Sequence, residues 1–394
     1  MRTRDELRDR ETLVQRLDSQ AAELGFHLCG VAPAVTPQGA HRLVEWVEAG
    51  YAAGMNYFAD RLEAYSDPGR VLAGVRSIVV LAYPYRTAQP ILPAAHEGRI
   101  ARYAWGSIDY HDLIHPRLKQ LKETIRAACP EAEARGVIDT APLMEREFAQ
   151  LAGLGWAGKN SLLLNKQRGS YFFLACLLTT LNLPLSEPHE TAHCGSCTRC
   201  LDACPTGAFA APGVVDSRRC ISYLTIEHRG AIPVELRPGI GNWLFGCDVC
   251  QEVCPWNVRA ANRNAAETTA SSPQLWPLAG HNPVDLIELL TLDDESFRER
   301  FRHTPLWRPR RRGILRNAAI CLGNAREPRA AVPLVQLLGD PEPLIRGAAA
   351  WALGQIGGQE PALRQRLQVE DDTEVRQELE AAAGCSAGRR DEES

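Results

Sequence analysis

The most constraining feature of the chain is a cluster of cysteines. Eight of its 13 cysteines lie between residues 194 and 254. Between His193 and Pro255 these cysteines are separated by turns, and apolar residues are too few to bury a core of their own. A segment of this kind folds around metal, because metal–thiolate bonds replace the stabilisation that a hydrophobic core would give. The stretch is therefore predicted to hold metal sites.

The spacing of these cysteines is that of bacterial ferredoxins. The run at 194–205 reads Cys-x2-Cys-x2-Cys-x3-Cys-Pro, and the run at 247–255 reads Cys-x2-Cys-x3-Cys-Pro. Together they supply seven thiolates where two four-iron clusters need eight, and Cys220 between them is the expected eighth. Because the fourth cysteine of such a run binds the other cluster, the predicted ligands are Cys194, Cys197, Cys200 and Cys254 for one cluster, and Cys204, Cys220, Cys247 and Cys250 for the other.

The alternative for the same residues is a pair of structural zinc sites. Zinc ribbons use paired Cys-x2-Cys knuckles, whereas both runs here end in a further cysteine followed by proline. Iron–sulfur clusters are therefore the favoured interpretation. Two clusters pass single electrons, which requires an external one-electron donor and a centre that uses the electrons.

Length, charge and apolar patterning limit the remaining possibilities. A chain of 394 residues is long enough for two or three domains. Its longest apolar run, residues 171–178, is less than half of a bilayer span, so no membrane segment is expected. The amino terminus is charged and lacks the apolar core of a signal peptide, so the chain is expected in the cytoplasm. Cysteines there serve metal or redox chemistry more often than disulfides.

Alternating helical and strand-like patterns run through residues 1–185. Three segments are typical of short strands: residues 26–32, 77–83 and 136–139. Residues 171–178 fit either a strand or a core helix. The alternation predicts an α/β domain, with a sheet flanked by helices.

The last part of the chain contains a repeat. Residues 315–319 (Leu-Arg-Asn-Ala-Ala) recur as residues 345–349 (Ile-Arg-Gly-Ala-Ala), and Val375-Arg376 falls at the same offset. Paired helices at this period are typical of a HEAT-like α-solenoid, although two unrelated Ala-rich helices are the alternative. The predicted division is an α/β domain at 1–185, a ferredoxin-like domain at 186–260, a linker at 261–300 and a HEAT-like repeat at 301–394.

Residues 153–160 match two nucleotide-binding patterns, but neither match fits its context. The pattern G-x-G-x-x-G and the P-loop both follow a strand, whereas the residues before this stretch are patterned as a helix. Asn160 also stands where the P-loop needs a hydroxyl group. Because Lys159, Asn160 and Ser161 offer hydrogen-bond donors, a cofactor contact and a plain turn both stay open.

Asp139 and His111 each allow two interpretations. Asp139 ends a predicted strand, where side chains of an α/β sheet reach the ligand crevice. An Asp before a helix is also a common N-cap. His111 lies among aromatic and polar residues and could bind a metal ion, although a lone His is more often a hydrogen-bonded structural residue.

A basic segment precedes the helical repeat. Residues 297–316 contain eight Arg residues and one acid, Glu299, in a chain whose net charge is -4. A local run of this kind predicts contact with a polyanion, and a solvated linker is the alternative. Trp307 and Pro309 lie among the Arg residues. Because a solvated linker has no need of Trp, contact with a nucleic-acid backbone is favoured.

The motifs together resemble the epoxyqueuosine reductase family, cobalamin-dependent iron–sulfur enzymes that modify tRNA. The resemblance is carried by Asp139-Thr140, Ala-Gly-Leu-Gly-Trp-Ala-Gly-Lys-Asn at 152–160, the cysteine run at 194–208, Arg-Cys-Ile-Ser-Tyr-Leu-Thr at 219–225 and Gly-Cys-Asp-Val-Cys-Gln at 246–251. It covers nearly the whole chain, including the terminal repeat.

The resemblance implies a cobalamin in the first domain, supplied with electrons by the two clusters. It implies reduction of epoxyqueuosine to queuosine in tRNA, the last step of queuosine biosynthesis, with Asp139 as the proton donor. The family motifs and the donors named above give the expected cofactor contacts Ala101, Arg102, Lys159, Asn160, Ser161, Leu163 and Ser222. The implied tRNA contacts are His228, Arg308, Arg310, Arg311 and Arg312.

Two other functions stay open at this point. One is a corrinoid reductive dehalogenase, which the basic solenoid and the lack of a twin-Arg export signal disfavour. The other is a two-cluster electron carrier without enzymatic activity, which would leave residues 1–185 without a role. The chain is expected to act as a monomer.

Overall fold

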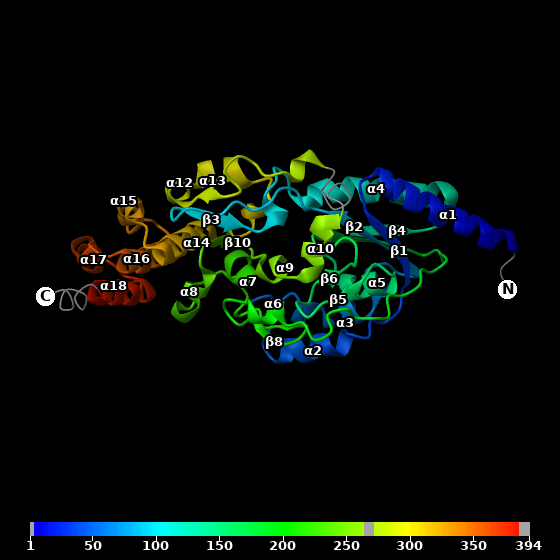
Figure 1. Cartoon of the computed structure of the whole chain (residues 1–394), viewed down its shortest axis with the longest axis horizontal. Coiled ribbons are helices and arrows are strands. Elements are labelled where there is room, and N and C mark those ends of the chain that lie inside the picture. The colour runs from blue at the N-terminus through cyan, green and yellow to red at the C-terminus, as the bar shows by residue number, and fades with distance from the viewer. Residues whose placement is uncertain (1–3, 264–271, 386–394) are drawn as a thin grey trace. The chain divides into compact units, whose positions relative to one another are not determined.

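The computed structural model describes residues 4–263 and 272–385 (Figure 1). The chain packs as two compact units, and each is assembled from three separate segments. The first unit contains residues 1–87, 108–218 and 248–276, and the second contains residues 88–107, 219–247 and 277–394. This division follows packing in space, whereas the sequence predicts four consecutive segments.

A four-stranded antiparallel sheet is the centre of the first unit. Its order is β1 (Leu28–Pro33), β2 (Ser77–Pro84), β7 (Phe172–Thr179) and β4 (Ala134–Val137). Every residue of β2 is buried, because helices cover both faces of the sheet. The sheet confirms the α/β prediction and shows that the apolar run at 171–178 is a strand and not a core helix.

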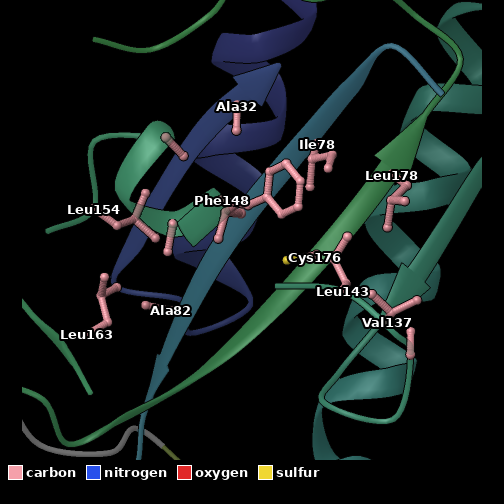
Figure 2. Close-up of a cluster of buried hydrophobic side chains, with 14 of the residues drawn as sticks. Ala32, Ile78, Ala82, Val137, Leu143, Phe148, Leu154, Leu163, Cys176 and Leu178 are labelled. Atoms are coloured by element: carbon pink, nitrogen blue, oxygen red, sulfur yellow. The ribbon is translucent and has the colours of Figure 1, made fainter. Parts of the chain in front are cut away.

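Helices of the first unit pack on both faces of this sheet. Helix α5 (Glu145–Leu151) covers one face, and α1 (Arg4–Glu23) and α4 (Tyr110–Ala128) pack together against the sheet. Phe148 of α5 belongs to a buried cluster with Ile78 and Cys176 (Figure 2). The remaining α-helices and strands of this unit are α2 (Ala40–Glu48), α3 (Leu62–Ser66), α6 (Arg199–Asp202), α9 (Val249–Glu252), α10 (Pro255–Arg263), β5 (Trp156–Ala157), β6 (Leu163–Leu164), β8 (Phe209–Ala211) and β9 (Val214–Val215).

The second unit contains a small sheet of three strands, β10 (Trp243–Phe245), β3 (Glu97–Ile100) and β11 (Val284–Asp285). Because β10 runs parallel to β3, the residues that follow the two strands lie at one edge of the sheet. There Ala101 donates its backbone N–H to the carbonyl oxygen of Phe245 at 2.8 Å. Helix α7 (Ile221–Ile226) packs on β10 at the same place.

The predicted helical repeat is confirmed. Helix α16 (Pro343–Ile356) packs against both α14 (Arg310–Ala325) and α18 (Thr373–Cys385), and α15 (Ala331–Leu337) and α17 (Glu360–Leu367) connect them. The Arg that recurs in register has the same structural role in the second and third copies. Arg346 donates to the carbonyls of Asp340 and Pro341, and Arg376 donates to those of Leu367 and Glu370. Each guanidinium thus holds the loop before its own helix.

The expected linker at 261–300 is in large part structured. Residues 264–271 lie outside the described residues. The remainder includes β11, α12 (Leu286–Leu290) and most of α13 (Asp294–Phe301), and Asp293 caps α13 by accepting the N–H of Ser296 at 2.8 Å. Within the part of the chain that is described, every helix is too short or too polar to span a bilayer.

Candidate cluster-binding and catalytic sites

Asp139 lies in the loop between β4 and α5, where two side chains from α4 reach it. The Tyr110 hydroxyl donates to its Oδ2, and Nε2 of His111 lies 2.7 Å from its Oδ1. Its backbone has a φ of 37°, which is uncommon for a residue other than glycine. A residue keeps such a conformation only where the surrounding structure holds it there. The N-cap of α5 is Met144, so Asp139 does not cap this helix.

His111 holds a proton beside Asp139. Its Nδ1 lies 2.7 Å from Oδ1 of Asp109, the N-cap of α4, so a carboxyl oxygen faces each ring nitrogen. Burial alone would lower the pKa of His111, but the hydrogen bonds to Asp109 and Asp139 outweigh burial and raise this pKa to about 9. At neutral pH the ring is therefore charged, and both nitrogens donate.

Glu145 is a second group beside Asp139 that holds a proton at neutral pH. Its Oε1 accepts the backbone N–H of Asp139 at 2.7 Å. Burial, followed by the charge of Asp139, raises the pKa of Glu145 to about 8, although the bond from this N–H acts in the opposite direction. Glu145 is therefore largely protonated at neutral pH. Tyr110 belongs to the aromatic and polar residues around His111 that the sequence shows, whereas no sequence motif indicates Glu145 as a functional residue.

Four cysteines approach one another in the first unit: Cys194, Cys197, Cys200 and Cys254. Burial raises the pKa of the Cys200 thiol, and the charges of the other three raise it further. Burial also raises the pKa of Cys254, whereas the backbone N–H groups of Trp256 and Asn257 favour its thiolate. These are the four cysteines that the ferredoxin spacing assigns to one cluster, and amide donors to sulfur are usual around such clusters.

A buried indole tests whether this pocket suits an iron–sulfur cluster. Trp156 packs with Cys254 and Cys194 and is only 1% exposed. Among the described residues, no group accepts its Nε1–H. A buried donor left unsatisfied costs about 1–3 kcal/mol. Because the sulfur atoms of a cluster accept hydrogen bonds, these residues fit a cluster at this place.

The expected ligands of the other cluster are divided between the units. Cys204 and Cys250 belong to the first unit, and Cys220 and Cys247 belong to the second. Sγ of Cys204 accepts the N–H of Ala208 at 3.3 Å. Cys220 is the N-cap of α7, and Cys247 follows Gly246 at the end of β10. The two cysteines of the second unit are thus placed by the start of α7 and by the end of β10.

Two of the cofactor residues expected at 159–163 bond to the cysteine segments of the first unit. Nζ of Lys159 donates to the carbonyl of Gly195 at 2.7 Å, and the buried Asn160 directs its Nδ2 to that of Cys250 at 3.4 Å. Ser161 has a φ of 62°, and its carbonyl accepts a bond from Arg146. The Leu163 side chain lies in the apolar core (Figure 2), and its backbone pairs with that of Ala157.

The glycines of this segment have a packing role. A Cβ at Gly155 would lie 2.0 Å from the carbonyl oxygen of Leu164, and one at Gly153 would lie 2.5 Å from that of Glu187. Both glycines therefore allow a close approach to the chain's own backbone.

The other cofactor residues gather in the second unit. Ala101 is buried, and a Cβ added at Gly246 would lie 2.6 Å from its Cβ, which explains glycine at that position. Nη1 of the buried Arg102 donates to the carbonyl of Ala88 at 3.1 Å. Ser222 lies half-buried in α7. These residues lie at the same edge of the small sheet as Cys247.

The expected tRNA-binding residues differ in exposure. Arg310 is exposed and lies over the Trp307 ring at 4.3 Å, while His228, Arg308 and Arg312 are half-buried. Nη2 of Arg311 lies 2.5 Å from Oδ2 of Asp340, and its Nε donates to the carbonyl of Leu292. The Arg311 side chain is only 11% exposed. Because its guanidinium is engaged internally, we omit Arg311 from the proposed RNA contacts.

Trp307 has a structural explanation as well. Its ring stacks on that of Phe297 with 5.6 Å between the centroids. The presence of Trp among the Arg residues is therefore no argument for RNA by itself.

Comparisons with known proteins cover nearly the whole chain. Family models match residues 66–140 (Epoxyqueuosine reductase QueG, DUF1730), 193–257 (4Fe-4S double cluster binding domain) and 311–384 (HEAT repeats). The chain is 41% identical over 358 residues to an epoxyqueuosine reductase of Pseudomonas aeruginosa, covering 89% of this chain and 96% of the relative. It is 38% identical over 353 residues to that of Escherichia coli, covering 88% and 90%.

Solved structures of similar proteins have the same fold. A crystal structure of an epoxyqueuosine reductase with an epoxyqueuosine-modified tRNA-Tyr stem loop matches with a TM-score of 0.88 and 32% identity, covering 96% of this chain and all of that one. The enzyme of Bacillus subtilis, with its catalytic Asp loop swung out of the active site, matches with a TM-score of 0.87 and 32% identity, covering 95% and 99%.

Proposed function

The chain belongs to the epoxyqueuosine reductase family, and on that premise we propose how its own residues perform the reaction. It is an oxidoreductase that reduces epoxyqueuosine to queuosine in tRNA, with two 4Fe-4S clusters and a cobalamin as cofactors. The observation that carries the proposal is the hydrogen bonding of Asp139 to Tyr110 and His111, with Glu145 on its backbone. A carboxyl group so placed suits proton transfer to a substrate oxygen.

Conversion of an epoxide to an alkene takes up two electrons and two protons and releases water. The cobalamin, when bound, supplies the two-electron chemistry at carbon, and the clusters deliver electrons one at a time. We propose that Asp139 is the proton donor to the departing oxygen. Because its carboxyl group accepts hydrogen bonds from the Tyr110 hydroxyl and the charged His111 ring, the proton that it delivers comes from Nε2 of His111 through Oδ1. Tyr110 orients the carboxyl group through Oδ2.

The proposed cluster ligands are the two sets of cysteines predicted from the spacing. In support, Cys194, Cys197, Cys200 and Cys254 approach one another beside the Trp156 indole, whose N–H has no acceptor among the described residues. The proposed cobalamin contacts are Lys159, Asn160, Ser161 and the Leu163 backbone in the first unit, and Ala101, Arg102 and Ser222 in the second.

We propose that tRNA contacts His228, Arg308, Arg310 and Arg312 of the second unit. The complex of a similar protein with a modified tRNA stem loop supports tRNA as the partner. We also propose that the chain acts as a monomer in the cytoplasm with an external one-electron donor. The two alternatives raised by the sequence, a reductive dehalogenase and a carrier without activity, lose their support, because the similar curated proteins are epoxyqueuosine reductases.

Replacement of Asp139 tests the proton-donor role. Asp139→Ala is expected to abolish formation of queuosine in epoxyqueuosine-containing tRNA while iron and cobalamin content stay at the wild-type level. Asp112→Ala is the matched control, because Asp112 is an exposed acid in the first turn of α4. Turnover by Asp139→Ala at the wild-type rate would remove Asp139 from the mechanism.

A further inference from the structure

Two buried polar residues of α14 hold the chain segments that carry Cys220 and Cys247. Arg316 is 1% exposed and Asn317 is fully buried, although both lie on a helix of the terminal repeat. Their partners are backbone carbonyls of α7, of β10 and of the loop after α7. All of these segments belong to the second unit.

Asn317 links α7 directly to β10. Its Nδ2 donates to the carbonyls of Thr225 and Leu244, both at 2.9 Å. The Thr225 hydroxyl then accepts the N–H of Gly246 at 2.9 Å and donates to the carbonyl of Ile221 at 2.7 Å. Ile221 and Gly246 are the immediate neighbours of Cys220 and Cys247. One side chain of the repeat is therefore two hydrogen bonds away from the backbone beside each cysteine.

Arg316 fixes the end of α7 and the loop that follows. Its Nη2 donates to the carbonyl of Leu224 at 2.7 Å, and its Nη1 donates to those of His228 and Gly230 at 2.8 and 2.7 Å. Its Nε donates to Oδ1 of Asn317 at 3.0 Å, which orients that amide. The last carbonyls of a helix have no partner within it and favour a cation.

The burial of this charge is costly, and its acceptors are neutral. A buried guanidinium is tolerated when its donors are satisfied, but an apolar residue would fill the same volume at lower cost. An apolar residue would, however, leave the carbonyls of Leu224, His228 and Gly230 without this donor. The pair therefore serves to fix backbone positions rather than to fill the core.

We propose that Asn317 and Arg316 are positioning residues for Cys220 and Cys247, two proposed ligands of one 4Fe-4S cluster. The terminal repeat thus contributes to the electron-transfer site as well as to the RNA face. This inference rests on the proposed assignment of Cys220 and Cys247 as ligands of one cluster. The geometry that it requires is the spacing between α7 and the end of β10, which Asn317 sets.

Asn317→Ala tests the inference, with Asn324→Ala as the matched control. Asn324 lies on the same helix, and its Nδ2 donates to two carbonyls as well, those of Arg237 at 2.8 Å and Gly241 at 3.0 Å. Iron content and electron paramagnetic resonance spectra are measured on full-length chains reconstituted without oxygen. Asn317→Ala is expected to lose about half of the iron, because one of its two clusters is lost, while Asn324→Ala keeps all of it.

Arg316→Lys keeps the inference testable if Asn317→Ala does not fold. Lysine retains the charge but cannot serve three carbonyls in fixed directions. It is expected to keep the fold, checked by circular dichroism, and to change the spectrum and reduction potential of this cluster alone. Full iron and an unchanged potential in both variants, or equal loss of iron in Asn324→Ala, would overturn the inference. A wild-type chain that binds a single cluster would overturn the ligand assignment instead.

Discussion

His111→Asn is the most informative change near Asp139. If His111 supplies the proton that Asp139 delivers, its own protonation must control the rate. The pKa of His111 is raised from 6.5 to about 9, which at 1.36 kcal/mol per unit is about 3 kcal/mol in favour of the charged ring. Because the Asp139 side chain is 44% exposed, screening by solvent reduces this to about 1–2 kcal/mol. The loss of that coupling corresponds to a rate lower by roughly fivefold to thirtyfold.

The protonation of His111 also predicts how the rate depends on pH. The ring is charged below a pH of about 9, so the wild-type rate is expected to be steady at neutral pH and to fall as the pH rises through about 9. Single-turnover formation of queuosine in a modified tRNA stem loop, with fully loaded and reduced protein, measures this rate. In His111→Asn the rate at neutral pH is expected to be lower, and the decline near pH 9 is expected to disappear.

His115→Asn controls for a general disturbance of α4. His115 lies one turn further along the helix, is exposed, and has its ring centroid 6.0 Å from that of His111. It is expected to keep the wild-type rate and profile. A His111→Asn protein with an unchanged rate and an unchanged decline near pH 9 would refute the role of His111.

Three further changes test other parts of the account. Trp156→Phe keeps an aromatic ring but removes the buried N–H, so the reduction potential of the neighbouring cluster is expected to fall in a spectroscopic redox titration. An unchanged potential would contradict the proposed N–H···S bond. Arg312→Ala is expected to reduce the salt dependence of tRNA binding by about one unit of slope, whereas Arg326→Ala, at the other end of α14, leaves it unchanged. The hydrogen bond from Arg346 is the main cause that lowers the pKa of Glu370 from 4.5 to about 2, so the carboxylate stabilises the fold above pH 4.5 and this contribution is lost as the pH falls through about 2. Glu370→Gln is expected to reduce the free energy of unfolding by about 3 kcal/mol at neutral pH in a urea titration, and an unshifted midpoint would refute this.

The sequence predicts those features that depend on residues close together in the chain. The unbroken apolar run of β2 predicts a buried strand, and the period of the terminal repeat predicts stacked helices. The run at 171–178 stays ambiguous, because an apolar run of this length packs equally well as a strand or as a buried helix. Only its pairing with β2 and β4 decides for a strand.

The surroundings of Asp139 depend on tertiary packing. Tyr110 and His111 are separated from Asp139 by more than a whole helix, and the packing of α4 against β4 brings them together. No periodicity or motif predicts such a contact. Arg311 and Arg312 are equally basic in the sequence, and only the position of Asp340 distinguishes the buried one. The same holds for Asn317, whose carbonyl partners are distant in sequence.

The nucleoside product of the wild-type chain tests the central claim most directly. The chain is loaded with iron, sulfide and cobalamin, reduced, and incubated with a tRNA stem loop that contains epoxyqueuosine, and the nucleosides are then analysed by mass spectrometry. Epoxyqueuosine is expected to disappear, and a nucleoside lighter by one oxygen atom, queuosine, is expected to replace it. Unchanged epoxyqueuosine, with both clusters and cobalamin present, would contradict the account.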